Sequence, residues 1–242
     1  MKAYIITMSN HAESLRMSKV LKESILKTDS EIQAEHFEAV QPPQLYQHII
    51  DIFGEHVAWT WPKTDAENRL DFATNLYMRK YEAFDQNRVI ACALSHFKLW
   101  KKCADEKETI MILEHDAVFN WKFEEKDILW DASWGAIGLN DPRGNTRKGQ
   151  LFNTMIENDF SDIQKIPLID GGDEMPLPMG LAGNSAYVMR PHAAKEVLAK
   201  IKEVGMWPND AILCRQLFPW LRVTKKYYTT TQRNVSTTTQ VA

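Results

Sequence analysis

The stretch Thr109-Ile-Met-Ile-Leu-Glu-His-Asp-Ala-Val-Phe119 decides the fold. Its apolar, β-branched first half, 110–113, predicts a buried strand, and three ionisable residues then follow directly. Ligands of open α/β sheets bind at the carboxyl ends of strands. Because alternate residues of an extended chain point the same way, Glu114 and Asp116 are expected to face one site while His115 faces away. The alternative is an ordinary strand end with solvated acids, since acid-x-acid triplets are common by chance.

The composition is that of a soluble globular protein, with 242 residues, 44% of them apolar and 25% charged. The net charge of −3 does not indicate a nucleic-acid binder, although a local basic groove stays open. The three cysteines are too widely spaced for a disulfide framework, and we interpret Cys92 and Cys103 as packing residues. With no membrane-length apolar run and no signal-peptide pattern, we expect a cytoplasmic protein.

The N-terminal part predicts a strand over 2–8, a helix over 12–27 and a second strand over 32–37. This order implies two parallel strands joined by a right-handed crossover. Thr7, Ser9 and Arg16 are therefore candidates for contacts with a nucleotide; the alternative for each is a capping or surface residue. No glycine-rich loop follows the first strand, which argues against a dinucleotide or Walker site.

The middle of the chain is predicted less evenly. Residues 44–87 give short helical stretches and a polar, helical run over about 67–84, and the segment could be an insertion that covers a site. Residues 88–103 predict a strong helix with apolar side chains on one face. Ser95 and His96 lie in its centre, where a histidine is usually a core residue with its hydrogen bonds satisfied.

Several motifs resemble glycosyltransferase family 25, which includes lipopolysaccharide sugar transferases and collagen galactosyltransferases. They are the Leu-Ser-His helix, the strand ending in acids, Trp134-Gly-Ala-Ile-Gly-Leu139, Gly183-Asn-Ser-Ala-Tyr187 and Pro208-Asn-Asp210. The chain also resembles the short members of this family that large tailed bacteriophages carry. The resemblance implies a GT-A type α/β/α sandwich with a mixed, mainly parallel sheet and a Rossmann-like nucleotide-binding core. It further implies one domain over 1–228. Because residues 229–242 are rich in Thr and Gln, we expect them to form a partly disordered tail.

The resemblance also implies a site. Asp116, with Glu114, would hold Mn²⁺ or Mg²⁺ against the diphosphate of a nucleotide-sugar, and Asp210 would act as general base of an inverting transfer. For Asp210 the alternative is a residue that complements a helix N-terminus. His115 stands where the family usually has an acid, and as a ligand it would favour softer metals. The expected donor-binding residues are Thr7, Ser9, Arg16, Ser95, His96 and Glu114, and the expected acceptor-binding residues are Asn140, Arg143, Asn184 and Tyr187.

The acceptor stays open between two hydroxyl classes. One is a lipopolysaccharide-type glycan, and the other is a hydroxymethylated base in phage DNA. Arg143, Arg147 and Lys148 make the loop over 140–150 locally basic, so it could contact a diphosphate or an acidic acceptor; a solvated turn is the alternative. The enzyme would be a hexosyl- or pentosyltransferase. The competing hypothesis is a non-catalytic nucleotide- or glycan-binding relative with the same fold.

Overall fold

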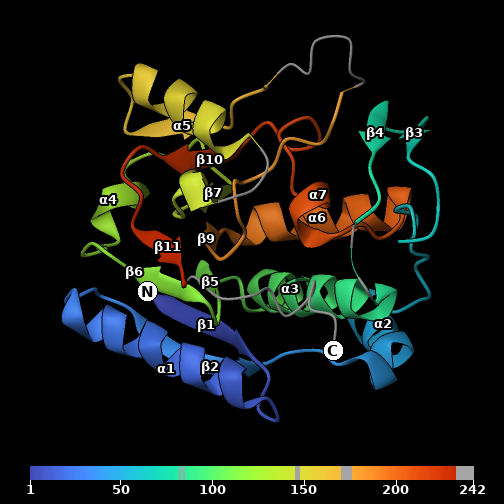
Figure 1. Ribbon diagram of the computed structural model, residues 1–242, viewed down its shortest axis with the longest axis horizontal. Helices are drawn as coiled ribbons and strands as arrows, with labels where there is room; N and C mark the ends of the chain where they lie inside the picture. Colours follow the sequence, from blue (N-terminus) through green and yellow to red (C-terminus); the bar gives the residue numbers. More distant parts are fainter. Residues whose placement is uncertain (82, 84, 145–147, 170–175, 233–242) are drawn as a thin grey trace.

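The computed structural model describes residues 1–242 except 82, 84, 145–147, 170–175 and 233–242 (Figure 1). The strands are β1 (Lys2–Thr7), β2 (Gln33–Glu38), β3 (Arg69–Asp71), β4 (Leu76–Met78), β5 (Ile110–Glu114), β6 (Ala117–Phe119), β7 (Ala136–Gly138), β8 (Ile163–Lys165), β9 (Ala186–Met189), β10 (Leu221–Thr224) and β11 (Thr229–Thr231). The helices are α1 (Ala12–Lys27), α2 (Leu45–Phe53), α3 (Gln86–Glu106), α4 (Lys126–Leu129), α5 (Gly149–Asn158), α6 (Pro191–Val204) and α7 (Asn209–Ile212), with short 3₁₀ turns at Pro42–Gln44 and Pro142–Gly144.

One seven-stranded sheet organises these elements, in the order β2-β1-β5-β9-β7-β10-β8. The pairings β1–β2, β1–β5 and β7–β10 are parallel, whereas β9 runs antiparallel to β5 and β7, and β8 runs antiparallel to β10. Strands β2, β1, β5, β7 and β10 therefore share one direction. The expected mixed, mainly parallel sheet is confirmed.

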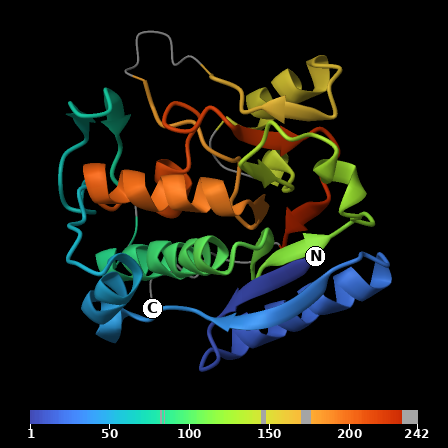
Figure 2. The same ribbon diagram turned by 180° about the vertical axis from the view of Figure 1, so that it is seen from behind.

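Helices cover both faces of this sheet. Alternate residues of β1 enter different cores: Tyr4 and Ile6 pack with α2, α3 and α6, while Ala3 and Ile5 pack with α1 and α4. Both sets are buried, as in strands covered on two sides. In both views α3 and α6 lie side by side, and α1 lies along β1 and β2 away from them (Figures 1 and 2). The expected α/β/α sandwich is confirmed.

The predicted opening unit is confirmed almost residue for residue. Strand β1 pairs with β2 in parallel from Lys2↔Gln33 to Thr7↔Glu38, and α1 forms the crossover between them. The same strand pairs with β5 on its other side, which places Ile6 opposite Glu114. The end of β1 and the acidic end of β5 therefore lie next to each other.

Helix α3 is the long helix expected from the apolar periodicity. The Asp85 side chain caps it by accepting a hydrogen bond from the Asn87 N–H (2.9 Å), and Lys107 ends it in the left-handed conformation. Its buried face carries Leu94, Phe97 and Trp100, each fully shielded from solvent. This packing fixes the helix beneath the sheet, so polar side chains on the same face have defined positions.

The helical run predicted over 67–84 is wrong, because β3 and β4 form an antiparallel hairpin there. The Asp71 carboxylate accepts hydrogen bonds from the Thr74 N–H (3.0 Å) and hydroxyl (2.6 Å), and Asn75 takes a positive φ of 56°. Asp and Asn suit such turns because their side chains bond the local backbone and tolerate this conformation. Turn chemistry thus overrides the polar pattern that we read as a helix.

The described fold extends beyond residue 228, where we placed the end of the domain. Thr229–Thr231 form β11, which pairs with β6, and the Gln232 N–H donates to the backbone carbonyl of Asp116 (2.7 Å). The chain therefore returns to the acidic end of β5 instead of leaving the fold, and the remainder of the predicted tail lies outside the described residues. Within the described residues, no helix has the length and apolar character needed to span a bilayer.

Candidate active site

The candidate site lies where β5, β7 and β1 end and β9 begins. The register pairs Ile6 with Glu114, Leu113 with Ala186, and Gly138 with Tyr187. Antiparallel β9 therefore begins at the edge where its parallel neighbours end. The ends of four strands thus lie together at this edge, and the last residue of β5 is Glu114.

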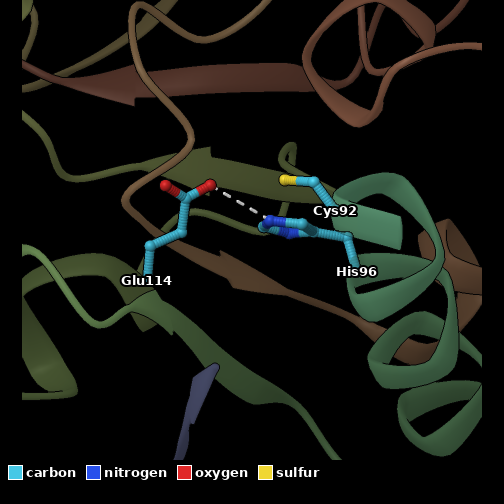
Figure 3. Close-up of side chains that lie close together, drawn as sticks. All are labelled: Cys92, His96 and Glu114. Atoms are coloured by element: carbon cyan, nitrogen blue, oxygen red, sulfur yellow. Dashed lines mark hydrogen bonds and ion pairs between the residues drawn. The ribbon is translucent and has the colours of Figure 1, made fainter. Parts of the chain in front are cut away.

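Glu114 is held by a buried hydrogen-bond chain that starts in the core. Trp100 Nε1 lies 2.7 Å from the Tyr187 hydroxyl, that hydroxyl lies 2.8 Å from His96 Nδ1, and His96 Nε2 lies 3.1 Å from Glu114 Oε1. Trp100, Tyr187 and His96 are at most 1% exposed, whereas the Glu114 side chain keeps 31% of its surface exposed. Figure 3 shows the last bond of the chain, between the imidazole and the carboxylate.

The direction of this chain follows from its donors. An indole N–H can only donate, so the Tyr187 oxygen accepts from Trp100. Complete burial raises the pKa of Tyr187 well above its usual range, so the phenol keeps its hydrogen and donates it to His96 Nδ1. The imidazole hydrogen then lies on Nε2 and points at Glu114. His96 is thus a satisfied core histidine that also orients a carboxylate of the site.

Glu114 and Asp116 form an electrostatically coupled pair. Burial pushes the pKa of Glu114 up, but the hydrogen bond from His96 and its electrostatic interaction with the carboxylate outweigh this effect, so the pKa is lowered overall. Burial, followed by the charge of Glu114, raises the pKa of Asp116 to about 7. Asp116 Oδ1 is buried without a hydrogen-bond partner among the described residues. Two neighbouring carboxylates, one of them with an oxygen that lacks a hydrogen-bond partner among the described residues, can together bind a cation.

His115 is directed elsewhere. Its pKa is lowered mainly by burial, and its electrostatic neighbours besides Glu114 include the backbone of Ile6 and the side chains of His11 and Glu13. These residues belong to β1 and the start of α1. The alternation inferred from the sequence, in which His115 faces away from the acidic pair, therefore agrees with these surroundings.

Asp210 approaches the same acids from the short helix α7. Tyr81, from the segment without a chemical interpretation in the sequence, donates its hydroxyl to both carboxylate oxygens of Asp210. Asp210 is exposed to solvent, yet desolvation by the surrounding protein and the charge of Glu114 raise its pKa against the opposing hydrogen bond from Tyr81. Gly180 permits this arrangement, because a Cβ there would lie 2.6 Å from the Asp210 carbonyl oxygen.

Cys92 is a second site residue, besides Tyr81, that the sequence interpretation missed. It lies one helical turn before His96 on α3, and Cys92, His96 and Glu114 can bring their ligand atoms within 4.8 Å of one another. Figure 3 shows the thiol above the imidazole on the side of the Glu114 carboxylate. The Cys-x-x-x-His spacing is the signal that could have found it, because residues four apart share a helix face.

The other expected donor-binding residues bond mainly within the protein. Thr7 is buried, with its hydroxyl bonded to the Ile5 carbonyl (3.0 Å) and Ser18 (2.8 Å). Ser95 donates to the Ala91 carbonyl and accepts from the Val40 N–H, both at 2.9 Å. Arg16 is paired with Glu13 on the surface of α1 (2.7 Å). Ser9 is exposed, and its N–H donates to Glu38 (3.2 Å).

The expected acceptor-binding residues divide into two groups. Asn140 and Asn184 are buried beside the site strands, and Asn184 has neither amide atom hydrogen-bonded among the described residues. Arg143 instead forms a bidentate pair with Asp141 (2.6 and 3.0 Å), and the Tyr187 hydroxyl is buried beneath His96. Lys148 is exposed before α5, and Arg147 lies outside the described residues.

Comparison with known proteins gives one match that identifies a family. Residues 1–213 match the profile of glycosyltransferase family 25, described as lipopolysaccharide biosynthesis proteins. The match covers most of the chain, so this protein belongs to glycosyltransferase family 25. Sugar transfer is the activity of that family. No curated protein matches the sequence.

Solved structures similar to this chain are also glycosyltransferases. An active-site mutant of LgtC aligns with a TM-score of 0.45 at 10% identity, covering 98% of this chain and 88% of the other. The galactosyltransferase LgtC in complex with donor and acceptor sugar analogs gives 0.43 at 10% identity, with 97% and 87% covered. Mouse xyloside xylosyltransferase 1 in its apo form gives 0.43 at 10% identity, with 91% and 82% covered. The family assignment rests on the sequence match.

Proposed function

We propose that this chain transfers a sugar from a nucleotide-sugar to a hydroxyl of a glycan, with inversion and with help from a divalent cation. The observation that carries the proposal is the gathering of Glu114, Asp116 and Asp210 at one sheet edge. Glu114 influences the pKa of each of the other two, so the three carboxylates lie within electrostatic reach of it. Such a concentration of negative charge is costly unless cations or protons accompany it.

Asp116 and Glu114 fit a hard divalent cation. Mg²⁺ and Mn²⁺ prefer carboxylate oxygens, and Asp116 offers one oxygen without a protein partner. When bound, such a cation would neutralise the negative charge that develops on a nucleoside diphosphate as it leaves. The exposed part of Glu114 and the unmet oxygen of Asp116 are the groups that we assign to holding it.

His96 positions the Glu114 carboxylate, and Tyr81 positions the Asp210 carboxylate. The chain from Trp100 through Tyr187 to His96 fixes one Glu114 oxygen and leaves the other free for a ligand. We assign the proton of the acceptor hydroxyl to Asp210, because a raised pKa makes a carboxylate a better proton acceptor near neutral pH. Tyr81 holds both Asp210 oxygens until an acceptor hydroxyl replaces it.

A glycan fits the acceptor side better than DNA. The unmet amide of Asn184 is a group that pairs with sugar hydroxyls. Binding to DNA depends on Lys and Arg side chains that contact phosphates. Arg143 instead forms an ion pair with Asp141, which neutralises its charge. The net charge of −3 works in the same direction. The family description, lipopolysaccharide biosynthesis protein, also favours a glycan.

The test is a transfer assay with a panel of nucleotide-sugars and Mn²⁺. Oligosaccharides of lipopolysaccharide type and hydroxymethylcytosine duplex serve as acceptors. We expect transfer to an oligosaccharide, strong loss of it in Asp210→Asn, and little change in Glu31→Gln, an exposed acid beside the opposite edge of the sheet. Transfer only to the modified duplex would contradict the glycan acceptor. Binding of a nucleotide-sugar with no turnover on any acceptor would support a non-catalytic relative instead.

A further inference from the structure

We propose that Cys92, His96 and Glu114 form a second kind of metal site, one that binds a borderline-soft divalent cation, above all Zn²⁺. Its donors are a thiol sulfur, an imidazole nitrogen and a carboxylate oxygen, which lie within 4.8 Å of one another (Figure 3). This donor set differs from the Glu114–Asp116 carboxylate pair to which the proposed transfer reaction assigns its cation. The two sets share Glu114.

The backbone already places the three donors correctly. Cys92 and His96 project from the same face of α3 one turn apart, and Glu114 meets them from the end of β5. Tetrahedral zinc separates its ligand atoms by roughly 3.3–3.6 Å, given its bond lengths to sulfur, nitrogen and oxygen. His96 Nε2 and Glu114 Oε1 already lie 3.1 Å apart, and the widest pair of donors needs to close by roughly 1.2–1.5 Å, which rotation of the Cys92 and Glu114 side chains can supply. Helix α3 itself need not move.

The donor chemistry selects the metal. Thiolate is a soft ligand that suits Zn²⁺, whereas Mg²⁺ and Ca²⁺ prefer carboxylate, carbonyl and water oxygens. Three protein ligands and one open position form the pattern of zinc sites that keep a water or an outside ligand. The remaining exposure of Glu114 gives a cation access from solvent. Mg²⁺ would gain nothing from Cys92 and His96.

The surroundings of His96 resemble those of a metal-binding histidine. Its Nδ1 lies 2.8 Å from the Tyr187 hydroxyl, and a partner at the second ring nitrogen commonly orients a histidine ligand. Binding at Nε2 requires the imidazole hydrogen to move to Nδ1, where the Tyr187 oxygen can accept it. The Cys92 thiol, which lies 3.9 Å from Asn209 Oδ1, gives up its proton to solvent. Zinc binding therefore releases one proton for each thiolate formed, and it becomes weaker at lower pH.

Sharing of Glu114 has a functional consequence, which rests on the proposed function. A zinc ion on Cys92, His96 and Glu114 breaks the His96–Glu114 hydrogen bond and draws the carboxylate away from Asp116. Zn²⁺ should therefore inhibit sugar transfer in competition with Mn²⁺ or Mg²⁺. Zinc binding itself requires neither donor nor acceptor, so it can be measured independently of that function.

The experiment uses Co²⁺ as a spectroscopic probe for zinc and the purified full-length chain. We expect one equivalent of Co²⁺ to produce a sulfur-to-cobalt charge-transfer band that Zn²⁺ abolishes. Cys92→Ala should lose the band and weaken binding at least tenfold, while Cys214→Ala should keep both, because Cys214 is buried outside the cluster. Asp116→Asn should also keep the band. Circular dichroism establishes that each variant is folded.

A second measurement needs no variant. Cys92 is partly exposed whereas Cys103 and Cys214 are buried, so an alkylating reagent should reach Cys92 first. Burial and the charges of the nearby carboxylates raise the pKa of its thiol, so the reaction is followed at alkaline pH. Zn²⁺ should slow this modification severalfold, and Mg²⁺ should not. A missing charge-transfer band, or alkylation at the same rate with and without Zn²⁺, would overturn the zinc site. Zinc binding in a protein that transfers no sugar would overturn the proposed function and leave the zinc site standing.

Discussion

Replacing Asp116 with asparagine should stabilise the metal-free protein at neutral pH while removing its activity. Burial and the charge of Glu114 raise the pKa of Asp116 to about 7, compared with 3.8 for an ordinary aspartate. A carboxyl whose pKa is raised by folding favours the folded state below about pH 4 and loses that contribution as the pH rises through 7. Asparagine has nearly the same shape and no charge, so it avoids the free-energy cost of an ionised carboxylate beside Glu114.

The size of the effect follows from the shift. A difference of roughly three units corresponds to about 4 kcal/mol at most, at 1.36 kcal/mol per unit. Asp116 is only partly shielded from water and shares its charge with Glu114, so we expect about 2–3 kcal/mol at pH 8. The gain should shrink steadily as the pH falls from 7 and vanish below about pH 3, where wild-type Asp116 is protonated in both the folded and the unfolded state.

Chemical denaturation in the presence of EDTA measures this difference at pH 5 and pH 8. Asp116→Asn should exceed the wild type in free energy of unfolding at pH 8, and by clearly less at pH 5. Glu31→Gln is the matched control and should show no such pH dependence. An equal or lower stability of Asp116→Asn at pH 8 would refute the reasoning, because it would mean that Asp116 is not a desolvated carboxylate in the folded protein.

Three further predictions concern the residues that support the site. Tyr187→Phe removes the hydroxyl between Trp100 and His96, so we expect a loss of about 1–3 kcal/mol in stability. In the same variant kcat should fall more than KM rises, and unchanged kinetics would argue against a positioning role. Ser95→Ala should cost about 1–2 kcal/mol in thermal or urea unfolding, because the Val40 N–H loses its partner, whereas a raised donor KM at full stability would make Ser95 a donor contact. Gly180→Ala should push α7 and Asp210 aside and lower kcat on the order of tenfold or more, and a crystal structure of the variant with Asp210 unmoved would count against that account.

Much of the architecture could be predicted because local pattern and tertiary fold agree. The β-branched runs at β1 and β5 and the apolar face of α3 give the central elements within a few residues. The position of the acids directly after β5 predicts the candidate site, because charged residues are costly inside a buried strand and are tolerated at its end. The hairpin at Asp71 was missed because its turn is set by a side chain that bonds the backbone, which periodicity does not record.

The finer roles at the site depend on contacts that sequence alone does not contain. The bonds that join Tyr187 to His96 and Tyr81 to Asp210 each span about a third to a half of the chain, at sequence separations of 91 and 129. A tyrosine expected to contact an acceptor lies instead under a histidine. An arginine expected to face a ligand is bound to Asp141, two residues before it. Such pairings follow from packing, so the residue types are predictable and their partners are not.

The most direct test of the central claim is the release of nucleoside diphosphate from a nucleotide-sugar, measured with and without Mn²⁺. The account predicts release that depends on Mn²⁺ in the wild type and in Glu31→Gln, and its loss in Asp116→Asn, which should stay folded. Full Mn²⁺-dependent release by Asp116→Asn would contradict the assignment of Asp116 and Glu114 to the cation of a sugar-transfer reaction.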